Sequence, residues 1–185
     1  MDILYIVGTG SRWYNYELKY SLRSLEKYGK NIDKVAIVGF KPHFLNDKII
    51  HIPCEDIGKN KHTRILNKVL TAIKSGQLSD HFLISSDDHF YVKETDFNNF
   101  PVYYRQEDIE ENNGGEYFRS LLETKKFLEE KGLTTYQTNP HCNTHFDVNI
   151  YNKYKDLFDA GMKLPDGIEM NCLMGNLMIA EGSTP

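Results

Sequence analysis

The sequence predicts an α/β fold in which helices cover both faces of a mainly parallel central sheet, a three-layer α/β/α arrangement. Residues 3–7 form a continuous apolar run, which is typical of a parallel strand buried on both faces. Residues 15–28 and 63–74 carry apolar side chains at helical spacing. A second apolar run follows at 81–85. Strands that alternate with amphipathic helices indicate βαβ units and therefore a parallel sheet.

The other elements of the first half follow the same alternation. Residues 35–38 and 48–52 read as two further strands between the predicted helices. Gly29 and Gly76 stand where glycine commonly ends a helix. The second half is less regular, and its predicted elements are a short strand at 101–104 and helices at 116–131, 149–159 and 168–178.

Composition indicates one globular domain. The chain has 185 residues, of which 40% are hydrophobic and 26% charged, and this excludes a disordered chain. A net charge of -4 gives no electrostatic footprint for nucleic acid. No apolar run approaches the ~18 residues of a membrane span, and the N-terminus lacks a signal peptide pattern. We therefore expect a cytoplasmic protein, with room for a peripheral position at a membrane.

Two compositional features are less decisive. Cys54, Cys142 and Cys172 are odd in number and widely spaced, so we expect reduced thiols rather than disulfides or a zinc site. Aromatic residues make up 12% of the chain. A sugar-stacking surface and a dense core explain this excess equally well.

The strongest motif is Ser86-Asp87-Asp88, directly after the predicted strand at 81–85. In open α/β sheets, ligands bind outside the carboxyl ends of the strands. Two adjacent carboxylates repel each other unless a cation or hydrogen-bond donors compensate their charge. Oxygen ligands of this kind select Mg²⁺, Mn²⁺ or Ca²⁺. The alternative is a solvated turn.

Two further segments could bind phosphate. The loop at residues 8–11, Gly-Thr-Gly-Ser, follows the first strand, but it is neither G-x-G-x-x-G nor a P-loop, and an ordinary turn explains it equally well. The basic segment 59–64 precedes a helix N-terminus, where a diphosphate would find N–H groups and positive charge. The alternative here is a solvated basic loop.

Two segments offer other chemistry. Within 141–145, which Pro140 and the Asn/Thr content mark as a loop, we expect one histidine to reach an ion held by Asp88 rather than to form a zinc site. Asp166 and Glu169 open the last helix, where a carboxylate could act as general base or as a helix cap.

Together these residues resemble GT-A-fold glycosyltransferases. Residues 15–25 read N-Y-E-L-K-Y-S-L-R-S-L and look like the N-x-E-L-x-Y-S-L-R-S-L stretch of Stealth-type capsule sugar-phosphate transferases. The Ser86-Asp87-Asp88 segment is similar to the D-x-D-like turn of both groups, although a serine replaces the first aspartate. The resemblance covers roughly residues 2–150.

The resemblance implies a single GT-A-like catalytic domain over residues 1–185, minimal or trimmed at its C-terminus. It would transfer a sugar from a nucleotide-diphospho-sugar donor to a glycan or lipid-linked acceptor in polysaccharide biosynthesis. The implied roles are metal binding (Mn²⁺ or Mg²⁺) by Asp88 and His145, donor binding by Gly8, Thr9, Arg12, Lys61, Arg64, Ser86 and Asp87, and, in an inverting enzyme, general base catalysis by Glu169 or, as second choice, Asp166.

Two alternatives remain open at this point. The first is a sugar-1-phosphate transferase of the Stealth type, which would release a nucleoside monophosphate. The second is a non-catalytic ligand-binding or interaction domain on the same scaffold. A haloacid-type phosphatase is excluded, because no D-x-D-x-[TV] motif follows the first strand.

Overall fold

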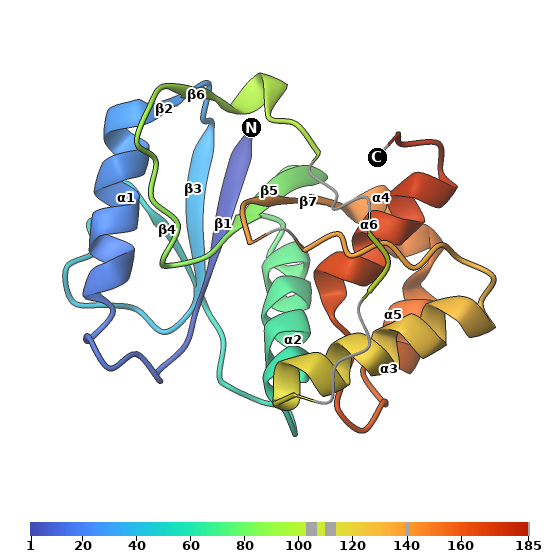
Figure 1. The fold of residues 1–185 in the computed structure, drawn as a ribbon. Coiled ribbons are helices and arrows are strands. Elements are labelled where there is room, and N and C mark those ends of the chain that lie inside the picture. The colour runs from blue at the N-terminus through green and yellow to red at the C-terminus, as the bar shows by residue number, and fades with distance from the viewer. Residues whose placement is uncertain (103–106, 110–113, 140, 185) are drawn as a thin grey trace. The chain divides into compact units, whose positions relative to one another are not determined.

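A computed structural model of the chain describes residues 1–102, 107–109, 114–139 and 141–184. The chain divides into two compact units, each considered by itself below (Figure 1). The first unit comprises residues 1–56, 68–101 and 142–146, and the second comprises 57–67, 102–141 and 147–185. Helix α2 (Lys61–Lys74) contributes to both, and its residues from Lys68 onward belong to the first.

The first unit is built on a five-stranded sheet with the strand order β4-β3-β1-β5-β7. The strands are β1 (Asp2–Val7), β3 (Lys34–Gly39), β4 (Ile50–Pro53), β5 (His81–Ser85) and β7 (Thr144–Asp147), of which β7 has its last residue in the second unit. β1 pairs in parallel with both β3 and β5, and β3 pairs in parallel with β4. The predicted α/β class with a mainly parallel sheet is therefore confirmed.

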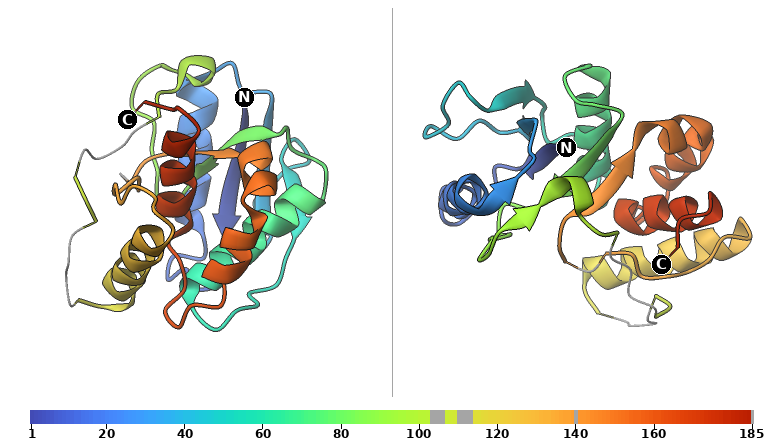
Figure 2. Two further views of the ribbon diagram at one scale, coloured as in Figure 1. Left: turned by 90° about the vertical axis from the view of Figure 1, so that its right-hand side faces the viewer. Right: turned by 90° about the horizontal axis from the view of Figure 1, so that it is seen from above.

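The apolar run of β1 places this strand at the centre of the sheet. Ile3, Leu4 and Tyr5 have no exposed surface, so both faces of the strand are covered. Helix α1 (Tyr16–Tyr28) covers one face, because Leu18 and Leu25 share a core cluster with Ile3 and Tyr5. Figures 1 and 2 show α1 and α2 on opposite faces of the sheet.

Local details of the first unit differ from the sequence-based expectations. Gly29 ends α1 as predicted, but its φ of -76° needs no glycine. Its role is steric, since a Cβ there would lie 2.5 Å from Ile32 Cδ1. The strands β2 (Gly29–Lys30) and β6 (Thr95–Asp96) form a short parallel ladder. The sequence did not predict it, because segments of two residues carry no recognisable strand pattern. Pro101 and Val102 lie outside any strand, and the rest of the strand predicted at 101–104 falls outside the described residues.

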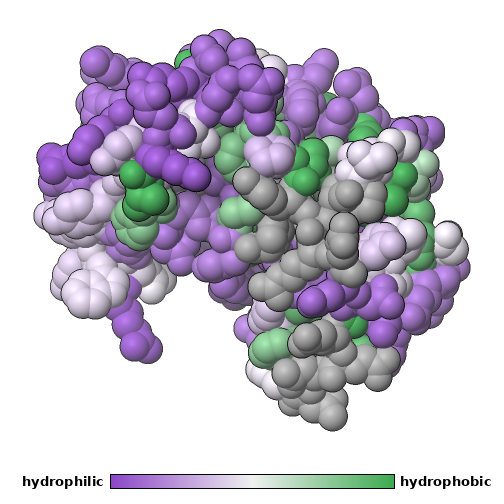
Figure 3. Space-filling model, turned by 45° about the horizontal axis from the view of Figure 1, so that its top comes forward, coloured by the Kyte–Doolittle hydropathy of each residue, from purple (hydrophilic) through white to green (hydrophobic). Residues whose placement is uncertain are grey.

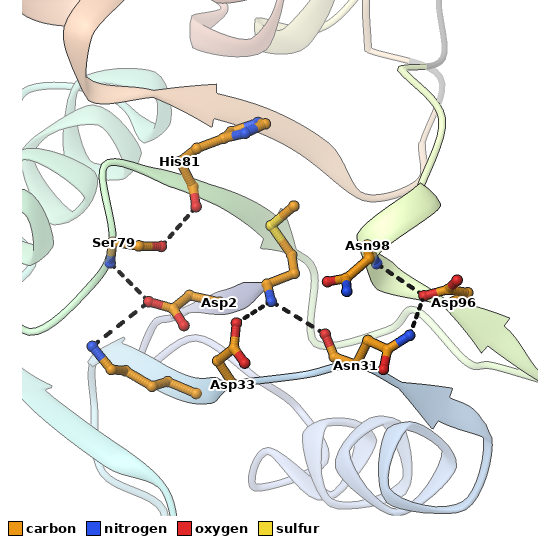
Figure 4. A network of polar contacts seen from close by, with 9 residues as sticks. Asp2, Asn31, Asp33, Ser79, His81, Asp96 and Asn98 are labelled. Carbon is orange, nitrogen blue, oxygen red and sulfur yellow. Dashed lines mark hydrogen bonds and ion pairs between the residues drawn. The ribbon is translucent and has the colours of Figure 1, made fainter.

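A polar network holds the amino ends of the strands (Figure 4). The Asp2 carboxylate accepts a hydrogen bond from the Ser79 backbone N–H at 2.7 Å and lies 3.9 Å from the Lys34 ammonium. Asp96, which caps the 3₁₀ helix η1 (Phe97–Asn99), accepts a hydrogen bond from Asn31 Nδ2 at 2.7 Å. Hydrophilic side chains predominate over this edge, at the upper left of Figure 3. The polar side chains at this edge therefore serve as hydrogen-bond and ion-pair partners for one another.

The second unit is helical. Besides the start of α2 it contains α3 (Glu116–Glu130), α4 (Val148–Lys153), α5 (Lys155–Gly161) and α6 (Met170–Ala180). The single helix predicted at 149–159 is interrupted at Tyr154, whose φ of -113° is not helical. Helix α6 is largely buried, as its apolar sequence indicates. Its fully buried Asn176 is satisfied by four hydrogen bonds, to Thr134, Tyr136 and Cys172.

The three cysteines, Cys54, Cys142 and Cys172, are free thiols, as the sequence predicts. Burial raises the pKa of Cys142 to about 11, and burial likewise raises the pKa of Cys172. Both are therefore protonated, weakly reactive thiols at neutral pH.

Candidate functional site at the carboxyl edge of the sheet

The strand order identifies a switch point between β1 and β5. The chain runs outward from β1 through β3 to β4, and then returns to add β5 on the other side of β1. Ligands of open α/β sheets bind at such a point, outside the carboxyl ends of the two central strands. Because Tyr5 pairs with Ser85 in parallel register, the segments that follow β1 and β5 leave the sheet at the same edge. These segments are Gly8–Ser11 and Ser86–His89.

The acidic motif forms a turn at this edge, as the sequence predicts. Ser86 and Asp87 are half-buried and Asp88 is exposed. The His89 ring closes the turn, since its Nδ1 accepts the Ser86 backbone N–H at 3.3 Å. A carboxylate oxygen of Asp88 and a ring nitrogen of His89 lie within 4.8 Å of each other. The turn thus offers oxygen and imidazole donors from adjacent residues.

Helix α1 fixes the position of this turn through two serines. Ser21 Oγ donates to the His89 carbonyl at 2.5 Å, and Ser24 Oγ accepts the Tyr91 backbone N–H at 3.0 Å. Because the Ser21 proton is used on His89, the Tyr5 hydroxyl donates to Ser21 Oγ at 3.0 Å. Burial raises the pKa of Tyr5, which keeps this donor protonated. The stretch that carries the Stealth resemblance therefore contributes hydroxyls that hold the backbone after the acidic turn.

The segment after β1 carries three of the predicted donor-binding positions, two of them exposed. Thr9 and Arg12 are exposed, and Gly8 is half-buried. A Cβ on Gly8 would lie 3.8 Å from Asp56 Oδ2 and 3.8 Å from Lys68 Nζ, so both charged groups lie beside this loop. The structure thus brings Gly8 and Thr9 to the same edge as Ser86, Asp87 and Asp88.

Sequence reasoning missed an ion pair that lies beside this loop. The Lys68 side chain is 5% exposed, donates to the Val7 carbonyl at 2.9 Å and forms an ion pair with Asp56. Thr9 Oγ1 donates to the same Asp56 carboxylate at 3.3 Å. The hydrogen bond from Lys68 holds the pKa of Asp56 below its usual range. The only available signal was a lysine beside Val69 in the amphipathic segment 63–74.

The ion pair predicts an asymmetric response to mutation. Asp56 is about a third exposed, whereas Lys68 is buried. Asp56→Asn therefore leaves a buried ammonium without its counter-charge, whereas Lys68→Met leaves a carboxylate that water can solvate. We expect Asp56→Asn to lower the free energy of unfolding by roughly 2–3 kcal/mol and Lys68→Met by about 1 kcal/mol. The double variant should recover part of the loss. Urea denaturation of all four proteins measures the coupling, and additive losses would contradict it.

His145 does not lie with Asp88. It belongs to β7, its Nδ1 is 2.9 Å from His81 Nε2, and its Nε2 donates to the Phe100 carbonyl at 3.1 Å. His81 begins β5, whereas Asp88 follows the carboxyl end of that strand. Both ring nitrogens of His145 therefore have protein partners at the other end of β5, and the predicted pairing with Asp88 is corrected. The sequence had indicated a loop over 141–145 because of Pro140 and the Asn/Thr content. Residues 141–143 do lie outside any strand, but Thr144 and His145 begin the edge strand β7.

The histidine pair predicts a loss of stability in mild acid. Burial, and then the neighbouring His81, lower the pKa of His145. The unfolded chain, with an ordinary histidine pKa of about 6.5, therefore binds more protons below that pH, so stability falls as the pH falls through and below it. His145→Gln should flatten this dependence in urea denaturation, while the exposed His43→Gln should not. An unchanged dependence of stability on pH in His145→Gln would contradict the prediction. A weaker dependence is expected to remain, because burial also lowers the pKa of His62.

Lys61 and Arg64, predicted to face the donor, belong to the second unit. Both are exposed in the first turns of α2. The Lys61 backbone N–H donates to Glu116 Oε1 at 3.2 Å, and Arg64 Nε donates to the Gly58 carbonyl at 3.0 Å. Their role toward a donor stays a prediction.

The two candidate bases also belong to the second unit and differ in environment. Glu169 is 7% exposed and caps α6 by accepting the Cys172 backbone N–H at 2.9 Å. Burial raises its pKa. Asp166 is 35% exposed and lies 3.3 Å from Arg119 Nε. The cap interpretation of Glu169 is thus observed, and Asp166 is the more exposed of the two carboxylates.

Comparison with known proteins assigns no family to the chain. A scan against protein-family models and a search of curated proteins both gave no match. None of the helices in the described part of the chain combines the length and the apolar character needed to cross a membrane.

Proposed function

We propose that the chain transfers a sugar from a nucleotide-diphospho-sugar to a hydroxyl acceptor with the help of a divalent cation. One observation supports this above all: the acidic Ser86–Asp88 turn and the Gly8–Ser11 loop follow neighbouring parallel strands at the switch point of the sheet. A nucleotide and a metal-bridged diphosphate are the ligands that such an edge suits. The sequence resemblance to GT-A-fold glycosyltransferases points the same way.

The acidic turn fits a hard divalent cation. Asp88 presents an exposed carboxylate, and the His89 ring adds a nitrogen donor within 4.8 Å. Carboxylate and imidazole together suit Mn²⁺, and carboxylate alone suits Mg²⁺. When bound, the ion would supply charge neutralisation for the departing nucleoside diphosphate. His89 takes the place in this proposal that the sequence had given to His145.

The chain's own residues would bind and orient the donor. Asp87, half-buried beside Asp88, would accept hydrogen bonds from ribose or sugar hydroxyls, and Ser86 would add a neutral donor or acceptor. On the β1 side, Thr9 lies in the loop that would hold the nucleotide, and the Lys68–Asp56 ion pair lies beside that loop. Ser21 and Ser24 act as positioning residues, since they fix the backbone at His89 and Tyr91.

A second candidate reaction rests on the same α1 contacts. The 15–25 stretch that resembles the Stealth-type transferases is hydrogen-bonded to the segment after the acidic turn. This supports a sugar-1-phosphate transfer as the alternative, in which the phosphate leaves with the sugar. The two reactions differ in their nucleotide product, a diphosphate for sugar transfer and a monophosphate for sugar-phosphate transfer.

Calorimetry with a panel of nucleotide sugars, with and without Mn²⁺, tests the proposal. We expect at least one donor to bind, with a gain in affinity when Mn²⁺ is present. Chromatography of the released nucleotide then separates the two reactions. Binding of no nucleotide sugar under either condition would refute both, and binding without turnover would favour a non-catalytic ligand-binding domain.

A further inference from the structure

Exposed aromatic side chains gather at the carboxyl edge of the first unit. Trp13 and Tyr14, in the loop after β1, are 74% and 80% exposed. Tyr20 on α1 and Phe40 after β3 are 58% and 44% exposed. We call the group the aromatic surface, and it consists of the exposed Trp13, Tyr14, Tyr16, Tyr20 and Phe40 together with the half-buried Phe44.

Ring contacts join the two loops that carry the aromatic surface. The Tyr16 ring centroid lies 6.1 Å from that of His43 and 6.0 Å from that of Phe44. The loops leave β1 and β3 side by side, because Val7 pairs with Gly39 at the strand ends. In Figure 1, the dark blue segment after β1 projects at the lower left, below α1. Tyr16, which follows the loop that carries Trp13 and Tyr14, is thus joined to the segment after β3 that carries Phe40.

The loop that exposes Trp13 is held in a strained conformation. Tyr14 has a φ of 54° and Asn15 a φ of 60°, both in the left-handed region; asparagine adopts this region readily, whereas a bulky residue such as Tyr14 rarely does. Ser11 Oγ fixes this geometry by accepting the backbone N–H groups of Trp13 at 3.1 Å and Asn15 at 2.9 Å. Backbone strain of this kind persists where the surrounding structure enforces it, often for function. Two large rings are therefore kept in solvent by a fixed backbone.

Positive charge accompanies the rings. Residues 12–20 and 40–44 carry three basic side chains, Arg12, Lys19 and Lys41, and a single acidic one, Glu17. The Glu17 carboxylate accepts the Ser11 hydroxyl. The Lys19 ammonium lies 5.3 Å from the Tyr16 ring centroid and 5.9 Å from that of Phe44. These two segments therefore carry a net positive formal charge in a chain whose net charge is -4.

We propose that the aromatic surface binds an anionic lipid bilayer, with Trp13 and Tyr14 at the level of the headgroups. Small ligands are bound in concave sites, whereas these two rings protrude. Tryptophan and tyrosine favour the membrane interface, and neighbouring lysines and arginines are attracted to anionic headgroups. Charge complementarity therefore favours a membrane over a neutral partner. This inference does not depend on the sugar-transfer proposal.

Trp13 is the one tryptophan of the chain, so its fluorescence reports on this surface directly. The experiment mixes the full chain with vesicles of phosphatidylglycerol and phosphatidylcholine, or of phosphatidylcholine alone. We expect a blue-shifted emission, protection from an aqueous quencher and co-sedimentation with the anionic vesicles. Salt should weaken the binding, because the electrostatic part is screened.

Two variants and a matched control locate the contact. Trp13→Ser/Tyr14→Ser and Lys19→Glu/Lys41→Glu should each lower vesicle binding by about tenfold or more. Lys74→Glu/Lys126→Glu changes the net charge equally at exposed positions elsewhere and should bind as the parent does. Circular dichroism checks that each variant folds.

Several outcomes would overturn the proposal. They are an unchanged Trp13 emission with anionic vesicles, equal losses in the control variant, or a Trp13 response to soluble glycans with none to vesicles. The last result would assign the surface to a saccharide. The measurement on the parent protein stands even where a variant fails to fold.

Discussion

Replacing Gly39 by alanine is expected to lower the free energy of unfolding by about 3 kcal/mol or more. Gly39 ends β3 with a φ of 111°, a conformation that side chains rarely adopt. A Cβ there would lie 2.1 Å from the Val7 carbonyl oxygen and 3.1 Å from Lys68 Cε. The same carbonyl accepts hydrogen bonds from Phe40 N and Lys68 Nζ, so it has little freedom to move.

Gly10→Ala is the matched control for this prediction. Gly10 lies in the neighbouring loop without positive φ, and no atom of the described residues lies within 4 Å of a Cβ placed on it. Its replacement should change stability by no more than about 0.5 kcal/mol. Urea denaturation measures both, with a shifted midpoint and an unchanged slope expected for Gly39→Ala. Similar denaturation midpoints for Gly39→Ala and Gly10→Ala would contradict the prediction, because they would show that the backbone at the end of β3 shifts to accommodate the Cβ.

The core elements could be predicted because the spacing of apolar residues along each of them indicates which of its faces are buried. Ile3, Leu4 and Tyr5 form an apolar run, and a continuous run of this kind requires burial on both faces. The leucines of α1 recur at helical spacing, and Leu18 and Leu25 are buried on the sheet. The acidic turn could be located for the same reason, since Ser86-Asp87-Asp88 directly follows a buried strand.

The edge strand β7 could not be predicted in this way. Its sequence, Thr144 to Asp147, is short and follows polar residues, and its pairing with β5 joins segments about sixty residues apart in the chain. A strand of this kind is specified by its partner rather than by its own pattern. The same limit misplaced His145, whose contacts with His81 and Phe100 are long-range.

Parts of the candidate site were missed for a related reason. Lys68 reads as a solvent-facing residue of an amphipathic helix, yet it is buried against Asp56 and the end of β1. Ser21 and Ser24 read as ordinary helix residues, and only the fold shows that they hold the backbone at His89 and Tyr91. The burial and the hydrogen-bond partners of these side chains depend on tertiary contacts between segments that are far apart in the sequence.

Asp88→Ala is expected to lower sugar-nucleotide turnover by at least about 100-fold. In the proposed function, the Asp88 carboxylate is the exposed oxygen donor of the acidic turn, and no neighbouring side chain in the turn offers the same geometry except Asp87. Asp88→Asn should be nearly as damaging, because an amide keeps the shape but removes the charge that a divalent cation requires. Stability should change little, since the side chain is exposed.

Asp47→Ala provides the control, because Asp47 is exposed in the loop after β3 and lies outside the turn. Turnover is measured as nucleotide released from the donor that calorimetry identifies, over a range of Mn²⁺ concentrations. A loss in Asp88→Ala that high Mn²⁺ partly restores would indicate weakened cation binding. Equal turnover in Asp88→Ala and Asp47→Ala would remove Asp88 from the site, and with it the role of the acidic turn in the proposed reaction.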